Sequence, residues 1–203
     1  MIALIAKMSK KVSFYFIKKN IVEIDDRELY EYSFEALFST VLNFCAIIII
    51  AFLFNSVLVT SLYLVGFIPM RLIAGGYHAT THLRCFLLLI CSYSLFLLVV
   101  KLAPMSIVNH MSITFVAISA GVIFVLAPVA DDNKPLSAVE YKRNKARSRI
   151  MVIFYFVVLL FMIIFIKNSQ IAFSVVMGLL SVALSLLAGY IGNRKASEDL
   201  CDR

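Results

Sequence analysis

The chain has 203 residues, of which 62% are apolar and only 15% carry a charge, whereas globular chains are about 45–50% apolar and about 25% charged. A soluble domain of this length cannot hide so much apolar surface, so the composition excludes a soluble globular protein and predicts helices in lipid. The net charge of +7 does not indicate nucleic-acid binding, because the basic residues flank apolar stretches and form no single stripe. We expect anionic lipid headgroups as their counter-charge.

The N-terminal stretch, residues 2–19, predicts an amphipathic helix that lies on the membrane surface. Its apolar face is formed by Ile2, Ile5, Val12 and Phe16, and its lysines fall mostly elsewhere. The first nineteen residues carry five lysines, which interrupt any apolar run before it reaches signal-peptide length, so we expect this segment to be retained. Residues 1–33 are assigned to a cytosolic or interfacial helical region. Within it, Asp25 and Asp26 are N-cap candidates for a second helix that runs into the first span.

Six apolar segments follow, at 34–54, 56–70, 85–103, 106–127, 150–166 and 171–190. A helix of about 20 residues crosses the roughly 30 Å of bilayer hydrocarbon. The second and fifth segments are short, and Pro69 is expected to distort the end of the second. The sequence therefore predicts an all-α fold, a polytopic membrane helix bundle of about six transmembrane helices spanning residues 34–190, followed by a cytosolic tail, 191–203.

The basic residues predict the orientation of this bundle. With a cytosolic N-terminus and six alternating helices, the inner segments are 1–33, 71–84, 128–149 and 191–203. These segments hold 17 of the 19 Lys and Arg residues, and only Lys101 and Lys167 fall outside. Such a bias is typical of cytoplasmic loops. We therefore expect a multi-pass protein of the cell membrane with both termini in the cytosol.

Two features of the C-terminal half predict contacts. Small residues at Gly178, Ser181, Ser185 and Gly189 lie close to one face of the last span. They would allow close helix packing within the monomer, with a homodimer seam as the alternative. Residues 128–149 predict a cytosolic loop with a basic run from Lys142 to Arg149. That run either marks the cytosolic side or attracts an acidic peptide, and Asp131 and Asp132 form either an acidic turn or a substrate contact.

Chemistry-bearing residues concentrate in residues 71–85, RLIAGGYHATTHLRC, at the expected cytosolic boundary. Ionisable groups at membrane depth are costly and therefore point to function. Gly75 and Gly76 break the helix, and irregular backbone at this depth is tolerated only against protein or water, which predicts a lined cavity. If helix resumes near His78, Cys85 lies two turns further on the same face, with His82 between them.

A cysteine beside a histidine suits nucleophilic catalysis, because the imidazole takes the thiol proton and stabilises the thiolate. The spacing alone is also compatible with an ordinary interfacial pair. A zinc-dependent hydrolase is a third reading, since His78, His82 and Cys85 form H-x3-H-x2-C and supply three zinc ligands. Against zinc, Ala79 stands where the HExxH motif places its glutamate base.

A non-enzymatic membrane transporter or adaptor is a further reading. Such proteins usually carry charged or polar residues deep inside several spans. Here the first span holds Glu35 and Asn43, and Asn109 and His110 lie near an outer end. The spans are otherwise nearly free of such residues, which does not favour this reading.

Two ordered motifs give the chain a family resemblance. Arg71, Gly75-Gly76, His78 and Cys85 form R-x3-GG-x-H-x6-C, and residues 127–136 read APVADDNKPL. This combination resembles the AgrB family, the accessory gene regulator B membrane endopeptidases of Gram-positive quorum sensing. The resemblance also covers the length, the six apolar segments and the basic amphipathic N-terminus, so it extends over nearly the whole chain.

The resemblance implies a membrane cysteine endopeptidase that cuts the C-terminal part from a short amphipathic propeptide, an AgrD-like substrate. The remainder is held as a thioester and closes to a thiolactone or lactone. By matching position, Cys85 would be the nucleophile and His78 the general base and later acid. Arg71, Gly75 and Gly76 would order the site or bind substrate, with no metal or cofactor. Backbone N–H groups near Gly75-Gly76 or at the start of the next helix are candidate oxyanion donors.

Overall fold

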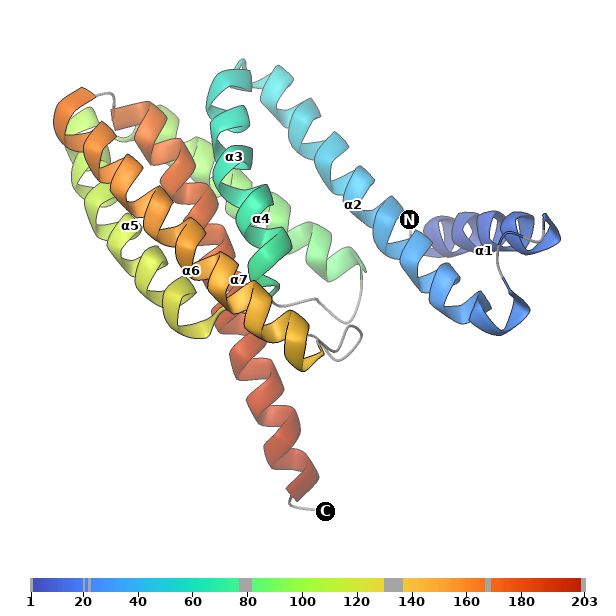
Figure 1. Ribbon diagram of the computed structural model, residues 1–203. Helices are drawn as coiled ribbons and strands as arrows, with labels where there is room; N and C mark the ends of the chain where they lie inside the picture. Colours follow the sequence, from blue (N-terminus) through green and yellow to red (C-terminus); the bar gives the residue numbers. More distant parts are fainter. Residues whose placement is uncertain are drawn as a thin grey trace. The chain divides into compact units, whose positions relative to one another are not determined.

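The computed structural model describes residues 2–19, 21, 23–76, 82–129, 137–166 and 169–201, with the side chains of 2–4, 25, 82–85, 105, 166, 169 and 193–201 left out. The elements in chain order are α1 (Ile2–Lys18), η1 (Ile24–Asp26), α2 (Arg27–Leu53), α3 (Val57–Ala74), α4 (His82–Leu102), α5 (Met105–Leu126), α6 (Ala138–Phe161), η2 (Met162–Ile166) and α7 (Ser169–Cys201) (Figure 1). The described ranges contain no strand, and the predicted all-α class is confirmed.

Five of the described helices are long and apolar enough to cross a membrane, namely Arg27–Leu53, Val57–Ala74, Ser106–Leu126, Ala138–Phe165 and Gln170–Gly192. A shorter apolar helix covers Phe86–Leu102. These helices coincide with the predicted apolar segments, so the polytopic membrane bundle is confirmed. Large apolar side chains such as Leu72 (78% exposed) and Val125 (70% exposed) cover the outer surfaces, where lipid replaces water as the solvent.

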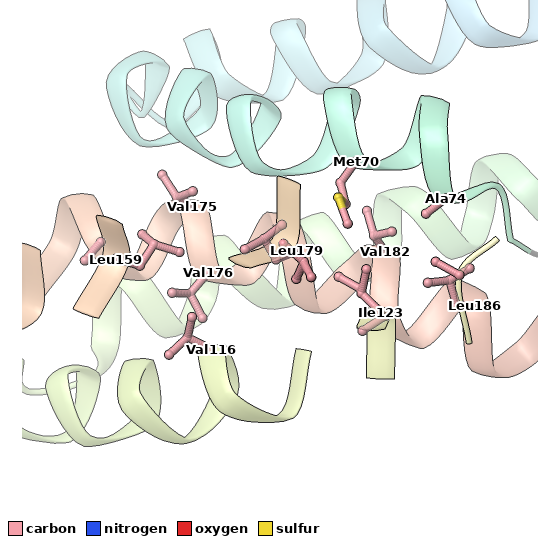
Figure 2. Packing of buried hydrophobic residues seen from close by; sticks show 14 of the residues in the cluster. Met70, Ala74, Val116, Ile123, Leu159, Val175, Val176, Leu179, Val182 and Leu186 are labelled. Atoms are coloured by element: carbon pink, nitrogen blue, oxygen red, sulfur yellow. The ribbon is translucent and has the colours of Figure 1, made fainter. Parts of the chain in front are cut away.

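The described residues form two compact units, one of residues 1–55 and 79–94 and the other of residues 56–78 and 95–203. In the second unit α7 is the central helix and packs along both α3 and α5, while α6 packs against α5 and α3 (Figure 1). Its buried core brings together apolar side chains from all four helices, including Met70, Val116, Leu159, Val176, Leu179 and Leu186 (Figure 2). This core holds α7 rigidly against α3.

The α3–α7 contact depends on two glycines. A Cβ on Gly66 would collide with the Val175 carbonyl oxygen, and a Cβ on Gly178 would collide with the Tyr63 carbonyl oxygen. One turn further along α7, the Tyr63 hydroxyl donates a 2.8 Å hydrogen bond to Ser181 Oγ. The small residues of the last span therefore pack within the monomer at these positions, as the sequence favoured.

The helix α3 runs through Pro69 to Ala74, four residues beyond the predicted end of the second segment. A proline lacks the N–H that would bond to the carbonyl four residues earlier, here that of Val65. The Tyr155 hydroxyl of α6 donates a 2.7 Å hydrogen bond to this Val65 oxygen. The neighbouring helix thus supplies the missing donor, and α3 stays continuous.

In the first unit, residues 2–18 form the predicted N-terminal helix, α1. Of its predicted apolar face, Ile5 is buried and Val12 and Phe16 are half-buried, while the described lysines are exposed. Ser9 and Ser13 are buried as well. The helices α1 and α2 pack together, with the Phe16 and Phe34 rings 5.5 Å apart. Asp26 occupies the N-cap position of α2 as predicted, but its side chain makes no cap hydrogen bond.

The predicted hydrophilic loop at 128–149 is largely helical, because α6 begins at Ala138. Its start is fixed by a capping box, in which Ser137 Oγ accepts from the Glu140 N–H at 3.2 Å and the Glu140 carboxylate accepts from the Ser137 N–H at 3.0 Å. The local pattern S-x-x-E indicates this start, and the sequence analysis overlooked it. Residues 191–201, predicted as a tail, continue α7.

Candidate functional site

The Gly75-Gly76 pair forms a sharp corner directly after α3. Gly75 has φ +69° and Gly76 has φ +117°. L-residues with a side chain rarely adopt such positive φ angles. A Cβ on Gly75 would meet the Val129 carbonyl oxygen, and a Cβ on Gly76 would meet both the Arg71 guanidinium and Ser185 Oγ. At Gly75 both the backbone conformation and the Val129 backbone require glycine, and at Gly76 the positive φ favours glycine while a Cβ would displace the Arg71 guanidinium.

The chain that leaves α5 runs beside this corner. The Val129 N–H donates to the Ala74 carbonyl at 3.0 Å, and the Gly76 N–H donates to the Val129 carbonyl at 3.3 Å, which makes a parallel bridge between Gly75 and Val129. Val129 belongs to the stretch APVADDNKPL, whereas the glycines belong to R-x3-GG-x-H-x6-C. The structure thus brings Gly75 of the first motif beside Val129 of the second, although the two residues are 54 positions apart in the sequence.

Arg71 ties the corner to α7. From the last turn of α3, its Nη1 donates a 2.6 Å hydrogen bond to the Gly75 carbonyl oxygen and a second, very short one to Ser185 Oγ. Both groups are partly buried, where a hydrogen bond that involves a charged donor is stronger than one in water. The corner is therefore held at three points, by α3, by the chain after α5 and by α7.

The amides of the corner are not available as oxyanion donors in this structure. The Gly75 N–H donates to the Arg71 carbonyl at 3.2 Å, and the Gly76 N–H donates to the Val129 carbonyl. An oxyanion hole requires N–H groups that point at the developing charge. Our expectation for these two amides is therefore wrong.

The predicted catalytic pair lies outside the described side chains. His78 belongs to residues 77–81, which are not described, and Cys85 lies in the first turn of α4, where the structure describes the backbone only. The side chain of His82 is likewise outside the described part, and so are Asp131 and Asp132. Of the predicted site residues, the structure brings together Arg71, Gly75 and Gly76, and the roles of the others stay predictions.

Two participants in the site were missed by sequence reasoning. Ser185 entered only as one of several small residues of the last span, although its hydroxyl accepts from Arg71. Val129 lay inside a quoted motif without any assigned contact. The sequence offered one local signal for Ser185. Ser181 and Ser185 are four residues apart and therefore share a helical face, which indicates that this face makes polar contacts.

A metal site has no support among the residues that could be searched. No group of three or more His, Cys, Asp or Glu in the described part of the chain could hold a metal ion. The side chains of His78, His82 and Cys85 lie outside the described part of the chain, so a zinc site formed by them stays a prediction. Cys45 and Cys91 are free and exposed.

These features define a multi-pass helical membrane protein with a constrained glycine corner at the end of one span. The sequence model of AgrB, accessory gene regulator B, matches residues 9–186, and the chain therefore belongs to the AgrB family. It is 26% identical over 202 residues to a protein of Clostridium perfringens (strain SM101 / Type A) whose name describes it as AgrB-like, with 94% of each chain covered. No solved structure shows significant similarity. Membership assigns the protein to the accessory gene regulator system of quorum sensing.

Proposed function

We propose that this protein is a membrane cysteine endopeptidase that processes a small quorum-sensing propeptide. The observation that carries the proposal is the AgrB match over residues 9–186, within which R-x3-GG-x-H-x6-C is complete. Cys85 is the nucleophile and His78 its general base. Arg71 and the two glycines order the segment that carries them.

The proposed reaction has two acyl transfers. His78 takes the proton of Cys85, the sulfur attacks the scissile carbonyl, and the C–N bond breaks as the imidazolium returns its proton to the leaving amine. A cysteine or serine side chain within the bound peptide then attacks the thioester and releases Cys85. Ring closure through sulfur converts the thioester on Cys85 into the thioester of a thiolactone. Because one thioester replaces another, this step loses little bond energy.

Water competes with ring closure, because it attacks the same acyl group and would release a linear peptide. A site walled by helices and lipid suppresses this hydrolysis. The corner supports such a site, since its backbone is packed against Val129 and Ser185 with its amides paired. In the proposed orientation both termini and the segment 71–85 face the cytosol, where an amphipathic, AgrD-like propeptide gathers on an anionic leaflet.

The first test is cleavage of a tagged propeptide that is co-expressed with this protein. The substrate is a short peptide with an internal Cys or Ser and an acidic tail, sought among the peptides encoded beside this chain. Cys85→Ala and His78→Ala should each abolish the size change of the propeptide while the membrane level of the enzyme stays constant. His82→Ala should retain substantial cleavage. Persistent cleavage in Cys85→Ala would refute the proposal.

Inhibitors separate the thiol from the zinc mechanism. Cleavage in isolated membranes should stop after treatment with iodoacetamide and continue in EDTA, since the proposed chemistry needs a thiolate and no metal. A zinc mechanism would replace the thiol mechanism if EDTA inhibited cleavage and if the cleavage rate fell equally in His78→Ala, His82→Ala and Cys85→Ala. Labelling of residues 71–85 only from outside the cell would contradict the cytosolic site.

A further inference from the structure

The last span contributes a residue to the candidate site. We propose that Ser185 of α7 is a positioning residue for peptide cleavage, because through Arg71 it fixes the glycine corner from which the chain proceeds to His78. This inference rests on the proposed function and adds a residue that neither motif contains. Ser185 acts through Arg71 and does not touch the reacting atoms.

The first argument is the rigidity of the anchor. Ser185 lies on α7 between Val182 and Leu186, whose side chains are fully buried (both 0% exposed). The same face of α7 packs against α3 through Gly178 and through the Ser181–Tyr63 hydrogen bond. The hydroxyl at position 185 is therefore held by the best-packed helix of the unit.

The second argument is the sharing of one donor. Arg71 Nη1 serves both Ser185 Oγ and the Gly75 carbonyl, so the guanidinium links the corner to α7, in addition to the Val129 hydrogen bonds that hold it on the other side. Loss of the serine oxygen would remove an acceptor from a partly buried cation. The guanidinium would then turn toward another acceptor, and its bond to Gly75 would weaken.

The third argument is distance along the chain. His78 is only two residues beyond Gly76 in the sequence, and one residue spans at most about 3.5 Å of chain. We therefore expect the direction of the backbone at the corner to set where the following segment begins. General-base catalysis requires a reach of about 3 Å to the proton that is removed. A misplacement of about 1 Å is enough to cost about a hundredfold in rate.

The test compares three variants of the full chain in native membranes. Ser185→Ala removes the acceptor, Ser185→Thr keeps a hydroxyl, and Ser181→Ala is the matched control. Ser181 lies one turn earlier on α7 and also binds α3, through the Tyr63 hydroxyl, but it does not contact the corner. All three variants are first compared for membrane level and thermal stability, so that rates refer to folded protein.

Two readouts follow. Cleavage of the same tagged propeptide gives kcat and KM, and the rate of Cys85 alkylation by iodoacetamide across pH reports thiolate formation without any peptide. For alkylation, Cys45, Cys91 and Cys201 are replaced by alanine. We expect Ser185→Ala to lower kcat about tenfold to a hundredfold with a smaller change in KM. We also expect it to shift the alkylation profile toward that of His78→Ala.

The expected pattern includes recovery of both readouts in Ser185→Thr and no change per folded molecule in Ser181→Ala. The inference is overturned if Ser185→Ala matches Ser181→Ala in both readouts, or if it lowers only the amount of folded protein. A loss that Ser185→Thr does not restore overturns it as well. Cleavage that survives Cys85→Ala would instead refute the proposed function, and the alkylation profiles would still decide whether Ser185 positions the segment.

Discussion

Two pairs of glycines occupy opposite parts of the α3–α7 region, and they meet different physical demands. Gly66 and Gly178 lie inside regular helices, where the missing side chains let the two backbones approach closely. Gly75 and Gly76 lie beyond the helix end, where both the positive φ angles and the nearby polar groups require glycine. The same residue type thus serves a helix crossing in one place and a backbone corner in the other.

The comparison separates the stability of the bundle from the geometry of the candidate site. Around Gly178 the colliding atoms are the backbone atoms of α3, so a larger residue would push two helices apart. Around Gly76 they include the Arg71 guanidinium and the Ser185 hydroxyl, so a larger residue would break a polar contact. Changes at the crossing should alter how much protein is folded, and changes at the corner should alter what each folded molecule does.

The largest effect is expected for Gly76→Ala. A Cβ at this position, with φ +117°, would displace the Arg71 guanidinium from Ser185, and the strain adds to the loss of the contact. We expect cleavage of the propeptide to fall at least about a hundredfold per folded molecule, measured as kcat in native membranes.

The control for this prediction is the amount of folded variant in the membrane, to which kcat is referred, because strain at φ +117° also lowers the stability of the fold. Wild-type kcat in Gly76→Ala would show that the corner tolerates a side chain. The distinction between the two glycine pairs would then be wrong.

The next effect is expected for Gly178→Ala, where the Cβ would meet the Tyr63 carbonyl and the Phe67 amide. Such overpacking costs about 1–3 kcal/mol, because neither backbone can move without disturbing the core. Thermal unfolding in detergent should show the loss of stability, while kcat per folded molecule changes less than about twofold. A drop in kcat as large as that expected for Gly76→Ala would show that the helix crossing also controls the geometry of the candidate site.

A smaller effect is expected for Tyr155→Phe, which tests the part of α3 between the two glycine pairs. The change removes the donor that satisfies the Val65 carbonyl opposite Pro69. Because this carbonyl belongs to an apolar span that faces lipid, where no water replaces the donor, we expect a loss of stability of about 1–3 kcal/mol. Tyr141→Phe is the matched control on the same helix, because no hydrogen bond of its hydroxyl supports α3. Equal stability of the two variants in thermal unfolding would show that α3 passes Pro69 without help from α6.

The sequence predicted the spans well, because the apolar length of a helix is a local property that each segment carries by itself. It also predicted the break at Gly75-Gly76, since paired glycines disfavour helix within a few residues. The Arg71–Ser185 contact could not be predicted in this way. It joins residues 114 positions apart, and its formation depends on how α3 and α7 are aligned along each other.

Pro69 is a second case in which a contact between distant segments could not be predicted from the local sequence. The local rule says that proline removes one backbone hydrogen bond of a helix. It does not say that Tyr155, on another helix, supplies a donor to the carbonyl of Val65, so that α3 continues to Ala74. The pairing of Val129 with the corner is a tertiary effect of the same kind, because residues from distant segments complete each other's hydrogen bonds.

The smallest effect is expected for Gly121→Ala in α5, which completes the comparison. Among the described residues, no atom beyond the local backbone of α5 lies within 4 Å of a Cβ at this position, and its φ is not in the positive range. Alanine should therefore stabilise α5 by at most about 1 kcal/mol through its helix propensity, with unchanged kcat. Thermal unfolding beside Gly178→Ala measures the contrast. If Gly121→Ala proved as destabilising as Gly178→Ala, the loss of stability would come from replacing any glycine. The contacts at the helix crossing would then not explain the stability of the bundle.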